Sequence, residues 1–86
     1  MIFKCNSNIY NTDNIAEIKV KSNKDYQLND YPTVVGILGN GSEITIMTFP
    51  YKYYPWDNGI NRFEEAQNIV DRIYNAIVNK NHCMEL

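Results

Sequence analysis

The sequence predicts an α+β fold, an antiparallel β-meander of four to five short strands packed against one C-terminal α-helix. Residues 33–49 alternate like a β-hairpin, whereas apolar residues after position 61 recur at helical spacing. With 86 residues the chain can form one thin core, so we expect 1–86 to be a single domain. We place strands within 1–49, an aromatic loop at 50–60, a helix at about 61–79 and a frayed tail at 80–86. The sheet is either open or a half-barrel.

Asn40-Gly41 is the strongest hairpin signal, because a two-residue type I′ turn needs positive φ at both central positions. This turn would place Ile37 opposite Ile44, within a matched set of apolar cross-strand pairs. A three-residue loop would instead place Ile37 opposite Glu43 and turn side chains to the wrong face. We therefore expect the two-residue loop.

The second face of this hairpin is more apolar than a solvated sheet face should be. Its apolar side chains are those of Val34, Leu38, Met47 and, where the strand ends, Phe49. Either another part of the chain covers this face, or it meets another molecule. In the second case these four residues form an interface.

The other strands are predicted from alternation and turn residues. Within 14–22, one face carries Ala16, Ile18 and Val20 and the other carries Glu17, Lys19 and Lys21. Residues 1–5 and 9–11 flank a turn-rich spacer at 6–8, which indicates a short hairpin or a bent strand within 1–11. Residues 23–32 are polar and indicate a surface loop, with the possible anchors Tyr26, Leu28 and Tyr31.

The helix is predicted from an apolar stripe with three- and four-residue steps, formed by Phe63, Ala66, Val70, Ile73 and Ile77. Asn61 and Glu64 have the spacing of a capping box at its start. Lys80 follows its end, where a positive charge suits the helix dipole.

Composition and charge narrow the function classes. The net charge is −2 and no Lys/Arg block exists, so we expect no double-stranded nucleic acid as partner. The N-terminus has no long apolar run, so we expect neither a leader nor a membrane segment. Two cysteines fit reduced thiols better than a disulfide framework, which favours the cytoplasm. Frequent Asn, Ile and Tyr indicate AT-rich coding, as in a low-GC bacterium or its phages.

The sequence offers no set of residues for catalysis or metal binding. His82 and Cys83 are adjacent in the expected tail, where they read as exposed residues rather than a thiol–imidazole pair. Two Cys and one His cannot supply the ligands of a structural zinc site. Residues 36–43 lack the Lys-Ser/Thr ending of a phosphate loop. We therefore predict no enzyme, no metal and no cofactor.

Residues 50–59, PYKYYPWDNG, concentrate aromatic side chains between two prolines and a glycine. Tyr and Trp lose little side-chain entropy on binding, so a stiff aromatic loop is typical of an interface hot spot. The binding residues that we predict are Tyr51, Lys52, Tyr53, Tyr54 and Trp56. The alternative is a packed corner between strand and helix. We expect a mixed outcome, with Trp56 in the core and at least two tyrosines exposed.

The order of NTDNIAEIKV, a hairpin around GNGSEITI, and FEEAQNIVDRI resembles the layout of the flagellar FlbD-type proteins. The shared features are an Asn-hydrophobic strand, a glycine hairpin and a terminal helix. They are features that make a fold, so the resemblance implies an order of elements and no function. Residues 50–59 have no counterpart in that layout.

These patterns predict a non-enzymatic protein-binding module, an adaptor or inhibitor of a partner protein, encoded by a phage or mobile element and homodimeric. Its partner would be another protein, a second copy of the chain, or both. One alternative is a small-ligand or nucleotide binder that uses residues 51–56. A second alternative is weak binding of single-stranded nucleic acid through stacking on the same aromatics.

Overall fold

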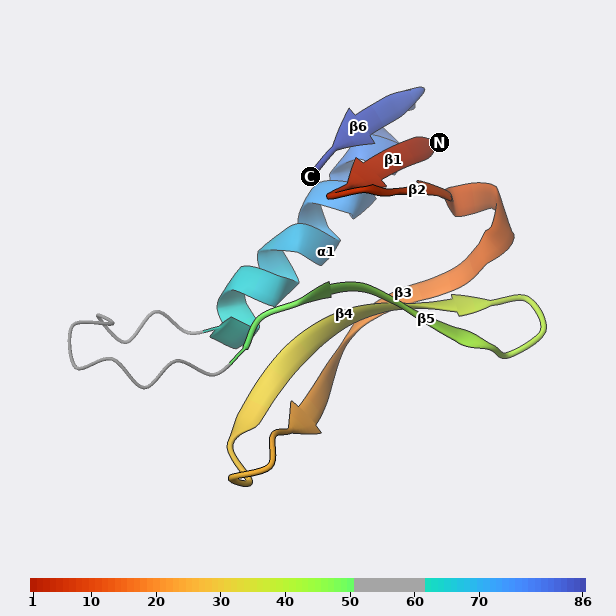
Figure 1. Cartoon of the computed structure of the whole chain (residues 1–86). Helices are drawn as coiled ribbons and strands as arrows, with labels where there is room; N and C mark the ends of the chain where they lie inside the picture. Colours follow the sequence, from red (N-terminus) through yellow and green to blue (C-terminus); the bar gives the residue numbers. More distant parts are fainter. Residues whose placement is uncertain (51–61) are drawn as a thin grey trace.

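The computed structural model describes residues 1–50 and 62–86, and there it confirms the α+β fold with one C-terminal helix (Figure 1). The elements in chain order are β1 (Ile2–Cys5), β2 (Asn8–Asn11), the 3-10 turn η1 (Thr12–Asn14), β3 (Ile15–Lys24), β4 (Asp30–Leu38), β5 (Glu43–Thr48), α1 (Arg62–Val78) and β6 (Cys83–Glu85). Apart from Pro50, the predicted aromatic loop lies outside the described residues.

The described strands form two sheets rather than one meander (Figure 1). One sheet has the order β3-β4-β5 and is antiparallel throughout. The other has the order β2-β1-β6, and its β1 and β2 form the short hairpin expected for residues 1–11. The helix α1 contacts β3 and β4 of the first sheet. The meander is therefore confirmed for β3, β4 and β5, and the second sheet is an addition to it.

The C-terminal residues form a strand, so the predicted frayed tail is wrong. β6 runs parallel to β1, and the N–H of Leu86 donates to the C=O of Lys4 at 2.8 Å. Met84 and Leu86 pack against the core, so burial as well as hydrogen bonding stabilises this short strand. Their alternation with Cys83 and Glu85 is the strand signal that the preceding polar residues concealed.

The β4–β5 hairpin has a three-residue loop, so the predicted two-residue loop is wrong. Gly41 has φ +86°, and its N–H donates to the C=O of Leu38 at 2.9 Å. The N–H of Leu38 donates in turn to the C=O of Ser42 at 2.8 Å. Only one loop residue, Gly41, thus has the positive φ that a type I′ turn requires twice. Ile37 consequently lies opposite Glu43.

A bulge in β5 restores the predicted register farther from the turn. Val34 pairs with Met47 as expected, and the register shifts directly after this pair, where Ile46 is the extra residue. The bulge lets Ile46 reach the core in spite of the longer loop, since its side chain is buried.

Half of the predicted 23–32 loop is strand, so this prediction is wrong for residues 23–24 and 30–32. β3 continues to Lys24 and β4 begins at Asp30, which leaves residues 25–29 as the connection. Polar cross-strand contacts extend the ladder here, because Asn23 Nδ2 donates to Thr33 Oγ1 at 2.9 Å. Lys24 Nζ and Asp30 Oδ1 form an ion pair at 2.8 Å beside the connection. Strand pairing therefore overrode the low β-propensity of these residues.

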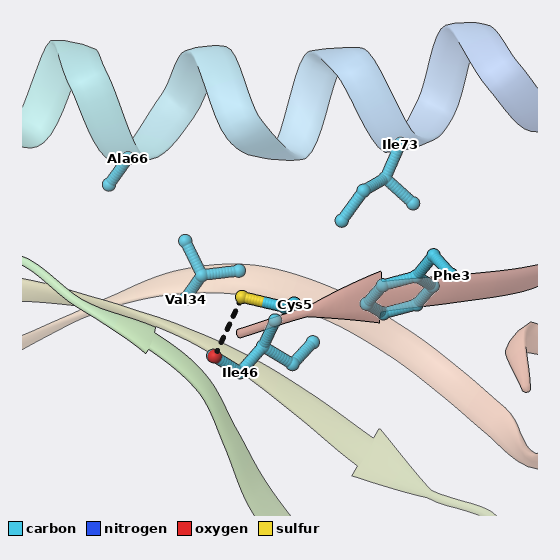
Figure 2. Packing of buried hydrophobic residues seen from close by; sticks show 6 residues of the cluster. All are labelled: Phe3, Cys5, Val34, Ile46, Ala66 and Ile73. Atoms are coloured by element: carbon cyan, nitrogen blue, oxygen red, sulfur yellow. Dashed lines mark hydrogen bonds between the residues drawn. The ribbon is translucent and has the colours of Figure 1, made fainter. Parts of the chain in front are cut away.

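The core lies where the helix and both sheets meet (Figure 2). Its buried cluster is formed by Phe3, Cys5, Val34, Ile46, Ala66 and Ile73. Figure 2 shows Ala66 and Ile73 pointing from α1 towards the strands. Phe3 also stacks on Tyr10, with ring centroids 5.0 Å apart, which ties β1 to β2.

The helix α1 buries Ala66 and Ile73 of the predicted apolar stripe and half-buries Val70, whereas Phe63 and Ile77 are exposed. It is followed by a left-handed residue. Lys80 has φ +57°, and its N–H donates to the C=O of Ile77 at 3.0 Å. The N–H of Asn81 donates to the C=O of Ala76 at 3.0 Å, which completes a Schellman cap. Asn61 of the predicted capping box lies outside the described residues. Among the described helices, none has the length and apolar character to cross a membrane.

We expect Lys80→Gly to raise the free energy of unfolding by about 0.5–1 kcal/mol, because glycine adopts positive φ without strain. Urea unfolding followed by circular dichroism measures this change. Asn79→Gly is the matched control, since the N–H of Asn79 makes a helical bond to the C=O of Asn75. The control should lose stability, and a gain of equal size in both variants would contradict the cap.

Candidate functional site

The β3–β4 hairpin presents two large apolar side chains to solvent at its turn. Tyr26 is 92% exposed and Leu28 is 75% exposed. Figure 1 shows this turn at the far end of the hairpin, away from α1 and from the sheet of β1, β2 and β6. We call residues 25–29 the hairpin tip. The tip is a protruding surface on which apolar side chains find no partner within the described chain.

Asp25 holds the hairpin tip in one conformation. Its Oδ1 accepts hydrogen bonds from the N–H of Gln27 at 2.9 Å and of Asn29 at 3.0 Å. The N–H of Leu28 donates to the C=O of Asp25 at 3.0 Å, and the N–H of Asp25 donates to the C=O of Asn29 at 3.0 Å. Tyr26 and Leu28 are thus displayed from a backbone that is hydrogen-bonded at both of its ends.

Leu28 has an unfavourable backbone conformation for a leucine. Its φ is +63°, in the left-handed region that costs L-residues about 1–2 kcal/mol. Asn tolerates this region better, as Asn6 does in the β1–β2 turn. Burial does not offset the cost, because the Leu28 side chain is exposed. Folding alone therefore gives no reason for leucine at this position, which is the pattern of strain found at functional sites.

A second apolar surface is an open groove of about 240 Å³ between α1 and the start of β3. Its walls include Ile15 and Ile18 from the strand and Val70, Tyr74 and Ile77 from the helix. The side chains of Tyr74 and Ile77 are exposed along it. Small-molecule pockets usually have about 300–1,000 Å³, so this groove fits side chains of a docked chain better than a whole metabolite.

Side chains from β1 and β2 bind the backbone of β5 and cover part of its edge. The Cys5 thiol donates to the C=O of Ile46, the bulge residue, at an Sγ···O distance of 3.5 Å (Figure 2). The Tyr10 hydroxyl donates to the C=O of Thr45 at 3.2 Å. These contacts join the two sheets at the point where the bulge interrupts the β4–β5 ladder.

Both donors keep their protons in the folded chain. Burial raises the pKa of the Cys5 thiol. Burial also raises the pKa of Tyr10, a charge on Cys5 would raise it further where the thiol is deprotonated, and a hydrogen bond with Asn8 acts in the opposite direction. A buried thiol with a raised pKa is a poor nucleophile, so Cys5 has a structural role.

The predicted interface residues lie mainly in the interior. Val34 is fully buried in the core, and Met47 and Phe49 are partly buried against it. Leu38, next to the hairpin loop, is half-buried. The chain itself therefore covers the second hairpin face, chiefly with α1 and β1, which is the first of the two alternatives that the sequence left open.

The predicted binding residues Tyr51, Lys52, Tyr53, Tyr54 and Trp56 lie outside the described residues, so their role stays a prediction. Within 1–50 and 62–86, no group of His, Cys, Asp or Glu side chains is placed to hold a metal ion. In the same ranges, every buried polar side-chain atom has a hydrogen-bond partner. The hairpin tip and the groove are thus the surfaces of the described chain that best suit a partner.

Sequence reasoning placed Tyr26 and Leu28 in a loop and missed the turn that presents both of them. The available signal was Asp25, because Asp often accepts backbone hydrogen bonds from the residues that follow it.

A scan against protein-family models and searches of the curated proteins and of the solved structures found no match.

Proposed function

We propose that this chain is a non-enzymatic protein-binding module, an adaptor or inhibitor that engages a partner protein through the hairpin tip. The observation that carries the proposal is Leu28, an exposed leucine in the left-handed region. A residue that weakens folding and is open to solvent is best explained by a contact made outside the chain. Its neighbour Tyr26 is of the residue type most enriched in interface hot spots.

The hairpin tip is pre-organised for binding. The Asp25 hydrogen bonds fix the turn before any partner arrives, so little conformational entropy is lost on association. Tyrosine adds large contact area with only two side-chain torsions, and its hydroxyl supplies one hydrogen bond. A short rigid tip can therefore contribute more affinity than its area suggests.

Shape and charge indicate what the partner offers. Sites for small molecules are concave, whereas this tip protrudes, so it fits into a cavity on another macromolecule. The ion pair of Lys24 and Asp30 balances the charge beside the tip. Both observations favour an apolar pocket on a protein over a nucleic-acid backbone, which would require several positive charges.

Site-specific photo-crosslinking tests the proposal. A photoreactive phenylalanine analogue replaces Tyr26 in one variant and the exposed Ile9 of β2 in a matched control. Illumination in the cells that naturally make the protein should give one discrete heavier product from position 26, identified by mass spectrometry. Products that are equally strong from position 9, or that arise only there, would contradict binding through the tip.

A further inference from the structure

Among the described residues, the strand β3 offers a long edge without a paired neighbour. It is an edge strand of its sheet and has ten residues, against four in β2 and three in β6, the edge strands of the other sheet. A register shift separates Ile15 from Glu17, so the regular part of the β3 edge runs over residues 17–24. The other edge of its own sheet, β5, is partly covered by Cys5 and Tyr10. Long exposed edges pair readily with a further strand, and natural proteins usually cover or shorten them.

The hydrogen bonds of the β4–β5 hairpin show which backbone groups of β3 are free. The N–H and C=O of Leu38 both form hydrogen bonds on the β5 side, and the C=O of Pro32 accepts from the N–H of Phe49 on the same side. Because backbone groups alternate in direction along a strand, odd-numbered residues of β4 face β3. Their register partners in β3 are also odd-numbered, for example Lys19 opposite Val35. The N–H and C=O groups of Ile18, Val20 and Ser22 therefore point to the outer edge.

The free edge lies beside apolar side chains. Ile18 shares its sheet face with Gly36 and Ile44, and it lines the groove against α1. Tyr74 and Ile77 extend the apolar surface along the helix and are exposed. A strand added at the β3 edge would thus gain backbone hydrogen bonds and apolar contacts together.

We propose that β3 pairs antiparallel with β3 of a second copy of this chain, on a two-fold axis through Ile18. The pairing joins two three-stranded sheets into one of six strands. A two-fold contact is self-complementary, so every interaction across it occurs twice. With the axis at Ile18, each Glu17 faces the partner's Lys19, and Ile18 faces the partner's Ile18.

Charge selects this register from its neighbours. An axis at Lys19 would place Lys19 opposite the partner's Lys19. An axis at Val20 would place Lys19 opposite the partner's Lys21. Like charges directly opposite each other are destabilising, whereas opposite charges on paired strands are favourable. The lysines of β3 disfavour pairing with most other strands. They favour pairing with a second β3 only in the register with the axis at Ile18, where Lys19 lies opposite the partner's Glu17.

The same axis brings further surface together. Antiparallel pairing of two edges places both helices on the same face of the joined sheet, so the exposed Tyr74 and Ile77 of each copy lie near the junction. The two hairpin tips then point in opposite directions. They lie about 40 Å apart, because six residues of β3 separate the axis from the tip in each copy. This bivalent display rests on the proposed function, whereas the pairing itself does not.

Sedimentation velocity and charge reversal test the pairing. The wild type should form a species of twice the 10.0 kDa chain mass. Glu17→Lys and Lys19→Glu should each weaken dimerisation at least about tenfold, because each variant places like charges opposite each other twice. Glu85→Lys and Lys4→Glu, which make the same charge changes in the other sheet, should leave it unchanged. An equimolar mixture of the two weakened variants should recover the dimer, since the mixed pair restores both opposite-charge contacts.

Cysteine crosslinking tests the register. In a Cys83→Ser background, only Ile18→Cys should form an intermolecular disulfide efficiently, because paired residues at the axis lie about 5.5 Å apart. Crosslinking strongest at Lys19→Cys or Val20→Cys would place the axis elsewhere and overturn the register. A wild type that stays monomeric from micromolar to millimolar concentration would overturn the pairing. A monomer that still crosslinks a partner from position 26 would leave the proposed function standing.

Discussion

Replacing Ile73 by alanine is expected to lower the free energy of unfolding by about 3–4 kcal/mol. Ile73 is 1% exposed and extends from the middle of α1 into the cluster shared by both sheets. Alanine would leave a cavity there that the strands cannot fill without moving. A chain of this size has about 4–13 kcal/mol of stability in total, so the variant should be close to unfolding. Urea titration followed by circular dichroism measures the change.

Ile9→Ala is the matched control for this prediction. It removes the same atoms from a side chain that is 71% exposed on β2. Its effect should stay within about 0.5 kcal/mol, as for most surface substitutions. Similar losses in the two variants would contradict the position of the core between α1 and the sheets.

Replacing Tyr26 by alanine is expected to weaken partner binding at least about thirtyfold, which corresponds to about 2 kcal/mol. The substitution removes the most exposed large apolar side chain of the hairpin tip and leaves the Asp25 hydrogen bonds in place. Folding should be unaffected, because Tyr26 makes no contact with the core. Isothermal titration against the partner identified by crosslinking measures the affinity.

The control for Tyr26 lies next to it in the turn. Gln27→Ala changes an exposed side chain while its N–H still donates to Asp25. We expect less than a threefold change in affinity for this variant, or about 0.6 kcal/mol. Equal losses in both variants would indicate a disturbed turn rather than a lost contact.

Local patterns were sufficient to predict the helix and the central strands. The stripe that includes Ala66 and Ile73 predicted α1 to within one residue at each end. Alternation predicted β3, and the same pattern separates its half-buried Ile18 and Val20 from its exposed lysines. Such signals repeat over many residues, so tertiary contacts do not override them.

Elements fixed by distant contacts could not be predicted in this way. β6 forms because β1, some eighty residues earlier, offers an unpaired edge. The three-residue loop at Gly41 is compatible with the sequence only because a bulge at Ile46 corrects the register. Neither partner choice nor a bulge has a strong local signature.

The candidate site depends on geometry that the sequence does not show. Tyr26 and Leu28 are ordinary residues in a polar segment, and only the φ of Leu28 shows that this leucine weakens the fold. The unpaired edge of β3 likewise follows from the strand order within the described residues, where Cys5 and Tyr10 of the other sheet donate hydrogen bonds to β5.

On the proposed function, Leu28 contributes to partner binding and lowers the stability of the fold. The most direct test is to measure unfolding and partner affinity for the single variant Leu28→Asn, because asparagine tolerates the left-handed conformation. We predict a free energy of unfolding higher by about 0.5–1 kcal/mol together with an affinity at least tenfold lower. A variant that gains stability and binds as tightly as the wild type would contradict the claim.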